Sequence, residues 1–383
     1  MKYNYLGNTD IKVSKLGFGV ARLPEKKVGK DYYLEKNIVR KMVETAVERG
    51  INYFDSGNIY CHGQSQRVVA EALKPYRDKV YLANKVMPKD LNKKGDLIKK
   101  ITILLDETHQ KYFDFFYFWG INRKDFDGII LKNDFLQEAL DAKRKGLINH
   151  IGFSFHDAPS AMQYIIDIAD IFETVICQYN LLDRTNEKMI EYASKKGLGV
   201  IIMSPLAGGT LLAPEKYKGE SVTVEDAMKF VMDNPNVACT LTGINSQNEL
   251  LQNIQIAEIE EPISKKRIQY LINIMDNMKK KSKINCTGCN YCQPCPQKIN
   301  ISNYFNLYML ADVYKLNKIA LDSYNYCVDI EKEEDISKCV GCRQCVDRCT
   351  QHIDIPIQLE KVKKFFETLN RFYIYGKATE ERQ

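Results

Sequence analysis

Eight cysteines in two short runs near the C-terminus constrain the fold of this chain more than any other feature. The first run is Cys286-Thr-Gly-Cys289-Asn-Tyr-Cys292-Gln-Pro-Cys295-Pro, and the second is Cys339-Val-Gly-Cys342-Arg-Gln-Cys345-Val-Asp-Arg-Cys349. Three cysteines at two-residue gaps can hold three corners of one four-iron cluster, while the fourth reaches the other cluster. We therefore predict two [4Fe–4S] clusters, bound by Cys286, Cys289, Cys292 and Cys349, and by Cys339, Cys342, Cys345 and Cys295.

Disulfides and zinc are the alternative uses of these cysteines. The chain opens on the polar segment Met-Lys-Tyr-Asn-Tyr, without an apolar stretch of signal-peptide type, so we expect a cytoplasmic protein, in which disulfides are rare. Zinc sites usually need only paired Cys-x-x-Cys, whereas each run here has four cysteines. The second run departs from the ferredoxin pattern at Thr350, where proline is usual. The four other cysteines are predicted to be buried free thiols: Cys61, Cys177, Cys239 and Cys327.

Composition argues against nucleic acid and membranes as partners. The apolar content of 45% supports a sizeable core. The formal net charge is +6, and two oxidised clusters with their thiolates would bring it to roughly +2, which is not a nucleic-acid-binding charge. The most apolar run, residues 113–121, is too short to span a bilayer.

The first 260 residues or so alternate apolar, strand-like runs with helical patterns. After a Tyr-rich opening that predicts a hairpin, we expect eight strands: 15–20, 52–56, 80–86, 114–119, 150–155, 175–179, 199–204 and 238–243. Asn37 is expected to cap the first helix and Gly50 to end it, and Gly146 and Gly197 are expected to end helices in left-handed conformation. Eight such units predict an α/β fold with a closed (β/α)8 TIM barrel. An open doubly wound sheet is the alternative, but no Gly-rich dinucleotide turn follows the first strand.

The remaining sequence predicts helices. We expect the barrel to span residues 1–262, a helical linker 263–283, and an α-helical dicluster ferredoxin domain 284–376. Helical patterns at 301–326 and 356–373 support the last assignment.

Three titratable residues are predicted to gather at the C-terminal ends of the barrel strands, where such barrels carry their active sites. Asp55 ends the second strand, Tyr60 follows five residues later, and Lys85 ends the third strand. A nearby ammonium favours the phenolate and would lower the pKa of the Tyr60 phenol. A carboxylate would keep Lys85 charged and oriented. Each of the three residues taken alone is more often structural than catalytic.

Several segments resemble the aldo-keto reductases. The segment Tyr53-Phe-Asp-Ser-Gly-Asn-Ile-Tyr60 resembles the family's "FDTA…Y" motif, and Leu82-Ala-Asn-Lys85 resembles its lysine strand. Its fifth, sixth and seventh strands are similar to residues 146–154, 178–183 and 203–208. The C-terminal domain is similar to that of the family's iron–sulfur branch.

The resemblance implies roles for individual residues. It makes Tyr60 the general acid, tuned by Lys85 and Asp55, and implies NAD(H) or NADP(H) as cofactor. The residues it assigns to the nucleotide are Ser154 and Gln178 at the carboxamide, Ser204, Leu206 and Gly208 along the phosphates, and Asn253 at the adenine. Ser246 begins the last barrel helix with a Ser-x-x-Glu capping box that includes Glu249, and either binds phosphate or only caps the helix.

The chain departs from the family in three places. Trp119 stands where the family has a fourth catalytic residue, a histidine; its indole can donate a hydrogen bond but cannot carry a proton. Trp119 either polarises a carbonyl or belongs to the core. Met203 replaces an aromatic residue that stacks on the nicotinamide in many members. The segment Asn245-Ser-Gln-Asn lacks a Lys or Arg for a 2′-phosphate, which disfavours a preference for NADPH. His62 and His156 lie near the same end, and either could supply an imidazole or have no role.

Three functional hypotheses follow. The first is an oxidoreductase that reduces or oxidises a carbonyl or conjugated small-molecule substrate with a nicotinamide and exchanges electrons with a ferredoxin-like carrier through its clusters. The second is a non-enzymatic barrel that binds nicotinamide or a metabolite while the clusters sense redox state. In the third, the clusters only stabilise the small domain.

Overall fold

Two compact units make up the chain, and each is described by itself. The computed structural model describes residues 1–29, 31–207, 211, 222–280, 282–284, 286, 292–314, 316–329, 335–349 and 351–380. One unit comprises residues 1–212 and 222–268. The other consists mostly of residues 269–383. Helix α10 (Lys265–Lys280) runs across the boundary. The division into a barrel, a linker and a cluster domain at residues 262 and 283 stays a prediction.

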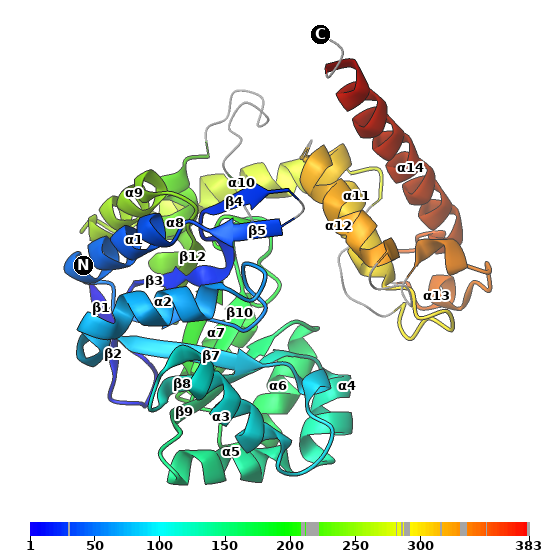
Figure 1. Cartoon of the computed structure of the whole chain (residues 1–383). Coiled ribbons are helices and arrows are strands. Elements are labelled where there is room, and N and C mark those ends of the chain that lie inside the picture. Colours follow the sequence, from blue (N-terminus) through cyan, green and yellow to red (C-terminus); the bar gives the residue numbers. More distant parts are fainter. Residues whose placement is uncertain are drawn as a thin grey trace. The chain divides into compact units, whose positions relative to one another are not determined.

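Eight parallel strands close into a barrel in the first unit (Figure 1). Their order around the barrel is β10-β11-β12-β3-β6-β7-β8-β9. The strands are β3 (Leu16–Gly19), β6 (Tyr53–Asp55), β7 (Tyr81–Val86), β8 (Phe113–Ile121), β9 (Ile148–Phe155), β10 (Thr174–Gln178), β11 (Gly199–Met203) and β12 (Cys239–Gly243). Each lies within two residues of its predicted bounds. The closed TIM barrel is therefore confirmed, and the open sheet is excluded.

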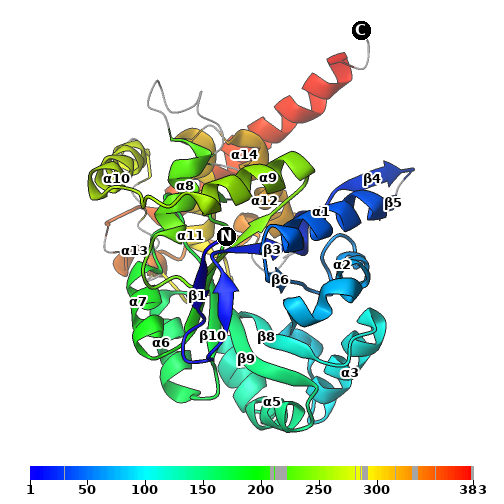
Figure 2. The same ribbon diagram turned by 90° about the vertical axis from the view of Figure 1, so that its left-hand side faces the viewer.

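Helices surround the barrel because each has one apolar stripe to bury (Figure 2). In the first of them, Val39, Met42, Val43 and Ala46 are buried at helical spacing. The helices are α1 (Lys36–Glu48), α2 (Ser65–Leu73), α3 (Asp96–Thr108), α5 (Phe135–Arg144), α6 (Pro159–Ile168), α7 (Glu187–Lys195), α8 (Val224–Met232) and α9 (Gln247–Glu258), with a single turn α4 (Arg123–Asp125).

Helix ends follow the sequence signals with one exception. Gly50, Gly146 and Gly197 have φ angles of 86°, 71° and 88°, so all three are left-handed after a helix, as predicted for the last two. The prediction that Asn37 caps α1 is wrong, because Asn37 lies inside the helix and Glu35 occupies the N-cap without a side-chain hydrogen bond. Asn37 is a good capping residue, but the N-cap position lies two residues before it, at Glu35.

Two antiparallel hairpins flank the barrel strands. The predicted N-terminal hairpin is formed by β1 (Tyr3–Tyr5) and β2 (Lys12–Ser14), which ends just before β3 begins and so lies at the N-terminal end of the barrel. A second hairpin, β4 (Glu25–Val28) and β5 (Asp31–Leu34), follows β3 and was not predicted. Its strands are short and largely exposed, so they lack the apolar alternation that identifies a strand in sequence.

The second unit is helical around an aromatic core. Besides α10 it contains α11 (Ile301–Asp312), α12 (Asn317–Asp329), the short α13 (Gln344–Asp347) and α14 (Ile355–Glu380). Stacked and edge-on rings join three of these helices, for example Tyr304–Tyr324 at 5.7 Å and Tyr324–Phe366 at 4.4 Å between centroids. The described part of the chain contains no helix that is both long and apolar enough to cross a membrane.

Candidate active site and cluster ligands

A buried ion pair lies at the C-terminal end of two neighbouring barrel strands. β6 pairs with β7, which brings Asp55 beside the Lys85 strand, and Lys85 Nζ donates a hydrogen bond to Asp55 Oδ2 over 2.6 Å. Both side chains are nearly inaccessible, at 3% exposure for Lys85 and 6% for Asp55. Asp55 Oδ1 is buried and has no hydrogen-bond partner among the residues that the structure describes. The Lys85 charge is thus held in place inside the protein by one carboxylate.

Tyr60 covers this ion pair. Its backbone is held in the loop after β6, where Tyr60 N donates to Gly57 O over 3.3 Å and Ser65 Oγ donates to Tyr60 O over 3.1 Å. Lys85 Nζ lies 5.4 Å from the centroid of the Tyr60 ring. The three residues that the sequence placed at this barrel end therefore come together.

The pKa of the Tyr60 phenol moves in the direction opposite to the expected one. Burial raises it above the usual tyrosine range, and the opposing Lys85 ammonium does not cancel that effect. Burial alone would lower the pKa of Lys85, but Asp55 and Tyr60 raise it overall. Burial also raises the pKa of Asp55 despite the lysine. Tyr60 therefore keeps its proton at neutral pH, as a proton donor requires.

Trp119 contacts Tyr60 and Lys85, two of the predicted catalytic residues. Its ring lies edge-on to that of Tyr60, with centroids 4.9 Å apart, and Lys85 Nζ lies 5.5 Å from the indole centroid. A cation between two aromatic faces favours the charged lysine. Trp119 thus lies beside Tyr60 and Lys85, and its role as a donor that polarises a carbonyl stays a prediction.

Gly57 leaves the space in which the two rings meet. A Cβ at Gly57 would lie 3.0 Å from two indole carbons and 3.1 Å from Cε2 of Tyr60. We expect Gly57→Ala to lower kcat by about 10-fold or more, because small displacements of catalytic groups are costly. Gly128→Ala is the matched control, since a Cβ there would have no described atom within 4 Å and its φ is not in the left-handed region. Equal kcat in wild type and Gly57→Ala would show that the ring arrangement is not important for turnover.

An open cavity of about 370 Å³ reaches from this set to the start of α9. Asp55, Tyr60 and Lys85 line one part of it, and the predicted nucleotide residues Ser204, Leu206 and Asn253 line another, together with Met203. Ser154 and Gln178 are not among the described lining residues. Instead Ser154 Oγ accepts a hydrogen bond from Gly120 N over 2.7 Å, and Gln178 Nε2 donates to Asp183 Oδ2 over 3.0 Å. The predicted phosphate contact Gly208 lies outside the described residues.

Ser246 caps α9, but the predicted capping box is only half formed. Its Oγ accepts from Glu249 N over 3.3 Å. The Glu249 carboxylate does not bond to Ser246 N in return; its Oε2 accepts from Asn245 N over 2.7 Å.

The two candidate histidines have different surroundings. His62 stacks on Tyr32 at 4.8 Å and lies 3.8 Å from Glu25, so it joins the catalytic loop to the β4–β5 hairpin. His156 is exposed at the end of β9, yet the protein around it lowers its pKa, and Lys85 lowers it further. The lowered pKa favours the neutral form of the His156 imidazole.

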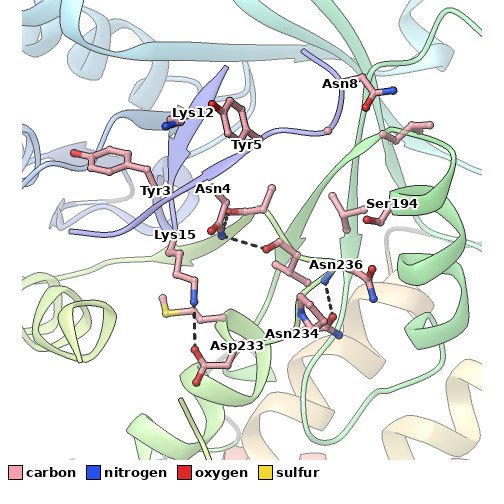
Figure 3. A pocket seen from close by; sticks show the side chains of 17 residues that line it. Tyr3, Asn4, Tyr5, Asn8, Lys12, Lys15, Ser194, Asp233, Asn234 and Asn236 are labelled. Carbon is pink, nitrogen blue, oxygen red and sulfur yellow. Dashed lines mark hydrogen bonds and ion pairs between the residues drawn. The ribbon is translucent and has the colours of Figure 1, made fainter. Parts of the chain in front are cut away.

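A larger cavity, of about 550 Å³, lies at the opposite end of the barrel (Figure 3). It is open and polar, and residues of the β1–β2 hairpin and of the segment before β12 line it. Its lysines form contacts within the protein. Lys15 Nζ lies 3.3 Å from Asp233 Oδ1 in an ion pair, and Lys12 Nζ lies over the Tyr5 ring at 4.8 Å. The smaller cavity, which contains the catalytic set, is the candidate active site.

Cysteines of both runs approach one another in the second unit. Burial raises the pKa of the Cys345 thiol to about 11, and neighbouring Cys339, Cys342 and Cys295 raise it as well. These are the four residues predicted to bind one cluster, and the fourth comes from the other run. Four thiols fit the donor set of a [4Fe–4S] cluster.

The other predicted ligands lie at the edge of the same helical core. Cys292 is buried, whereas Cys286 and Cys349 are partly buried against the core; Cys289 lies outside the described residues. Among the described residues, no three possible ligands stand at the spacing of a single metal ion. A four-iron cluster holds its thiolates farther apart than one ion does, since the irons lie between them. The remaining Cys61, Cys177, Cys239 and Cys327 are buried, as predicted, and are in no disulfide within the described part of the chain.

The model of the aldo/keto reductase family matches residues 15–225, more than half of the chain. The chain belongs to the aldo/keto reductase family. This protein is accordingly an oxidoreductase with a small-molecule substrate. A second family model, the 4Fe-4S dicluster domain, matches residues 285–353 and supports iron–sulfur clusters in the C-terminal unit of this aldo/keto reductase.

Known relatives agree with the family assignment. An uncharacterized oxidoreductase of Schizosaccharomyces pombe is 25% identical over 269 residues, which cover 66% of this chain and 84% of the relative. L-galactose dehydrogenase of Arabidopsis thaliana is 25% identical over 291 residues, or 67% and 88% of the two chains. The solved holo form of aldo-keto reductase AKR11C1 from Bacillus halodurans has a TM-score of 0.60 at 23% identity, covering 72% of this chain and 96% of that one. This structural similarity supports the barrel fold of the first unit.

Sequence reasoning missed one charged residue of the active-site cavity. Arg22, in the short turn Val20–Arg22 after β3, is a lining residue. Its position directly after the first strand was the available signal, because barrel active sites use the segments that follow each strand.

Proposed function

We propose that this aldo/keto reductase transfers hydride between NAD(H) or NADP(H) and a carbonyl or conjugated substrate, and that its two clusters carry electrons between this reaction and a ferredoxin-like carrier. The arrangement of Tyr60 over the buried Asp55–Lys85 pair, in a cavity at the C-terminal end of the barrel, is the observation that carries the proposal. Family membership supports an enzyme over a non-enzymatic sensor.

The protein's own residues would manage the proton and the charge. When bound, the nicotinamide supplies or accepts the hydride at the substrate carbon. Tyr60 donates its proton to the substrate oxygen in the reducing direction. Lys85 stabilises the phenolate that remains, and Asp55 keeps Lys85 charged and oriented. In the oxidising direction, the same phenolate takes the proton back.

The clusters would connect a two-electron reaction to one-electron carriers. Hydride transfer between nucleotide and substrate uses both electrons, so the clusters would instead re-reduce or reoxidise the nucleotide. Each cluster would supply one-electron chemistry when bound, and two clusters together would exchange the two electrons that, with one proton, interconvert NAD(P)+ and NAD(P)H. Cys295, Cys339, Cys342 and Cys345 would hold one of them, and their mutual proximity supports this assignment. Cys286, Cys289, Cys292 and Cys349 would hold the other.

The decisive experiment is a spectrum of anaerobically purified protein before and after addition of NADH or NADPH. We expect at least one nucleotide to bleach the visible absorption of the oxidised clusters, with dithionite as the reference for full reduction. If both nucleotides bind but only dithionite bleaches the clusters, even with substrate present, the coupling between the barrel reaction and the clusters is contradicted. Binding of neither nucleotide would contradict the nicotinamide site itself.

A further inference from the structure

The β4–β5 hairpin contacts the loop that carries Tyr60. It leaves the barrel after β3 and returns into α1 (Figure 1). Of the residues in its two strands, only Leu34 is buried, so the hairpin adds little to the apolar core. Its contacts with the Tyr60 loop are therefore the feature of the hairpin that calls for an explanation.

The backbone directly after Tyr60 is in a conformation that side chains disfavour. Cys61 and His62 have φ angles of 48° and 55°, and Gly63 follows at 79°. Left-handed backbone is unfavourable for a residue with a Cβ, and it persists where the surrounding contacts hold it in place. The position of Tyr60 therefore depends on what holds the two residues that follow it.

Side chains of this loop are attached to β5. The His62 ring stacks on the Tyr32 ring, with centroids 4.8 Å apart and planes 13° from parallel. Gln64 Nε2 donates a hydrogen bond to Tyr32 O over 2.7 Å, and Gln64 Oε1 accepts one from Leu34 N over 3.3 Å. The Gln64 amide thus uses both of its ends on the backbone of the hairpin.

Hydrogen bonds within the loop connect this attachment to Tyr60. Gly63 N donates to Tyr60 O over 3.1 Å, and Gln64 N donates to Cys61 O over 3.1 Å. Ser65 Oγ donates to Tyr60 O as well. A displacement of Gln64 would therefore be passed on to Tyr60 through a short chain of bonded peptides.

We infer that the β4–β5 hairpin positions the proton donor, and that Tyr32 and Gln64 are positioning residues that hold the Tyr60 loop beside the Asp55–Lys85 pair. This inference rests on the proposed function, since it assumes that Tyr60 donates the proton. Neither Tyr32 nor Gln64 is among the described residues that line the active-site cavity, so both act through Tyr60 and not on a ligand.

Hydrogen exchange of the cluster-loaded full chain tests the attachment without any substrate. Mass spectrometry of peptides that cover residues 57–65 reports the opening of the loop. We expect Tyr32→Ala to speed exchange there by about 2- to 10-fold, the effect of losing one aromatic contact. Gln64→Ala, which removes two hydrogen bonds to the hairpin, should change exchange in the same direction.

Tyr33→Ala is the matched control for Tyr32→Ala. Tyr33 is the next residue of β5 and is also exposed, at 51% against 38% for Tyr32. Successive side chains of a strand point to opposite faces, so Tyr33 does not share the face on which Tyr32 meets His62. Exchange of residues 57–65 should be the same in Tyr33→Ala as in the wild type.

Steady-state kinetics then separates positioning from a general loss of structure. Tyr32→Ala and Gln64→Ala should each lower kcat by about 10-fold, because small displacements of a catalytic group are costly, while nucleotide affinity stays unchanged. Tyr32→Phe keeps the ring that stacks on His62 and should retain the wild-type kcat. In the Tyr60→Phe background, Tyr32→Ala should have no further effect, since no proton donor is left to position.

Two results would overturn the inference. One is wild-type exchange of residues 57–65 in both Tyr32→Ala and Gln64→Ala. The other is a loss of kcat in Tyr32→Ala that is equally large in the Tyr60→Phe background. Failure of the proposed function is recognised separately, because the wild-type protein would then bind neither NADH nor NADPH, whatever the exchange of the loop.

Discussion

Replacement of Tyr60 by phenylalanine is expected to lower kcat by about 100- to 10,000-fold, the usual contribution of general acid catalysis. The phenol acts on the substrate oxygen in the transition state, so the affinity for the nucleotide should be nearly unchanged. Steady-state kinetics on an aldehyde panel and nucleotide titration measure the two quantities separately.

Tyr33→Phe is the matched control for this change. Tyr33 lies in β5 and is 51% exposed, so removal of its hydroxyl should leave kcat and nucleotide affinity as in the wild type. The pKa of Tyr60 adds a further signature. Because burial raises it, the protonated acid should persist above the usual tyrosine range, and kcat for reduction should not fall as pH approaches 10. If Tyr60→Phe retains wild-type kcat, Tyr60 is not the acid of this barrel.

Replacement of Cys295 by serine is expected to remove about four of about eight irons, since each [4Fe–4S] cluster contains four. The reason is its position: Cys295 belongs to the first run, but it lies close enough to Cys345 in the second run to raise the pKa of that thiol. Iron analysis and electron paramagnetic resonance of the reduced protein should show that one cluster is lost and the other is kept.

Cys349→Ser is the reciprocal variant and should affect the cluster of Cys286, Cys289 and Cys292. Cys177→Ala, at a buried thiol in the barrel, is the control and should keep all the iron. Loss of the same cluster in Cys295→Ser and Cys349→Ser would contradict the crossed ligand sets. Stoichiometric zinc without iron in anaerobically prepared wild-type protein would contradict the clusters altogether.

Local patterns in the sequence were enough to predict the barrel. A buried parallel strand is a nearly continuous apolar run, as residues 113–118 are, and a glycine after a helix marks a left-handed turn, as Gly146 and Gly197 do. These signals lie within a few residues, so no knowledge of distant contacts is needed. The β4–β5 hairpin was missed because its exposed strands carry no such pattern.

Part of the candidate site could likewise be predicted from the sequence, and part depended on the tertiary structure. The family motif predicted that Asp55, Tyr60 and Lys85 meet, because strand ends of a barrel share one face. The direction of the Tyr60 pKa shift could not be predicted in the same way, since it depends on how far burial outweighs the lysine. The partner of the Glu249 carboxylate was likewise decided by the geometry of the turn before α9.

The sequence by itself determined the class of this protein: a barrel oxidoreductase with two four-cysteine runs, since strand periodicity, cysteine spacing and short motifs are local properties. Only the tertiary structure decided the contacts that no local pattern carries. It set the Trp119 ring edge-on to the Tyr60 ring and brought the Arg22 side chain to Gly243. Such neighbours are set by the closure of the barrel and the packing of helices, which depend on contacts far apart in the chain.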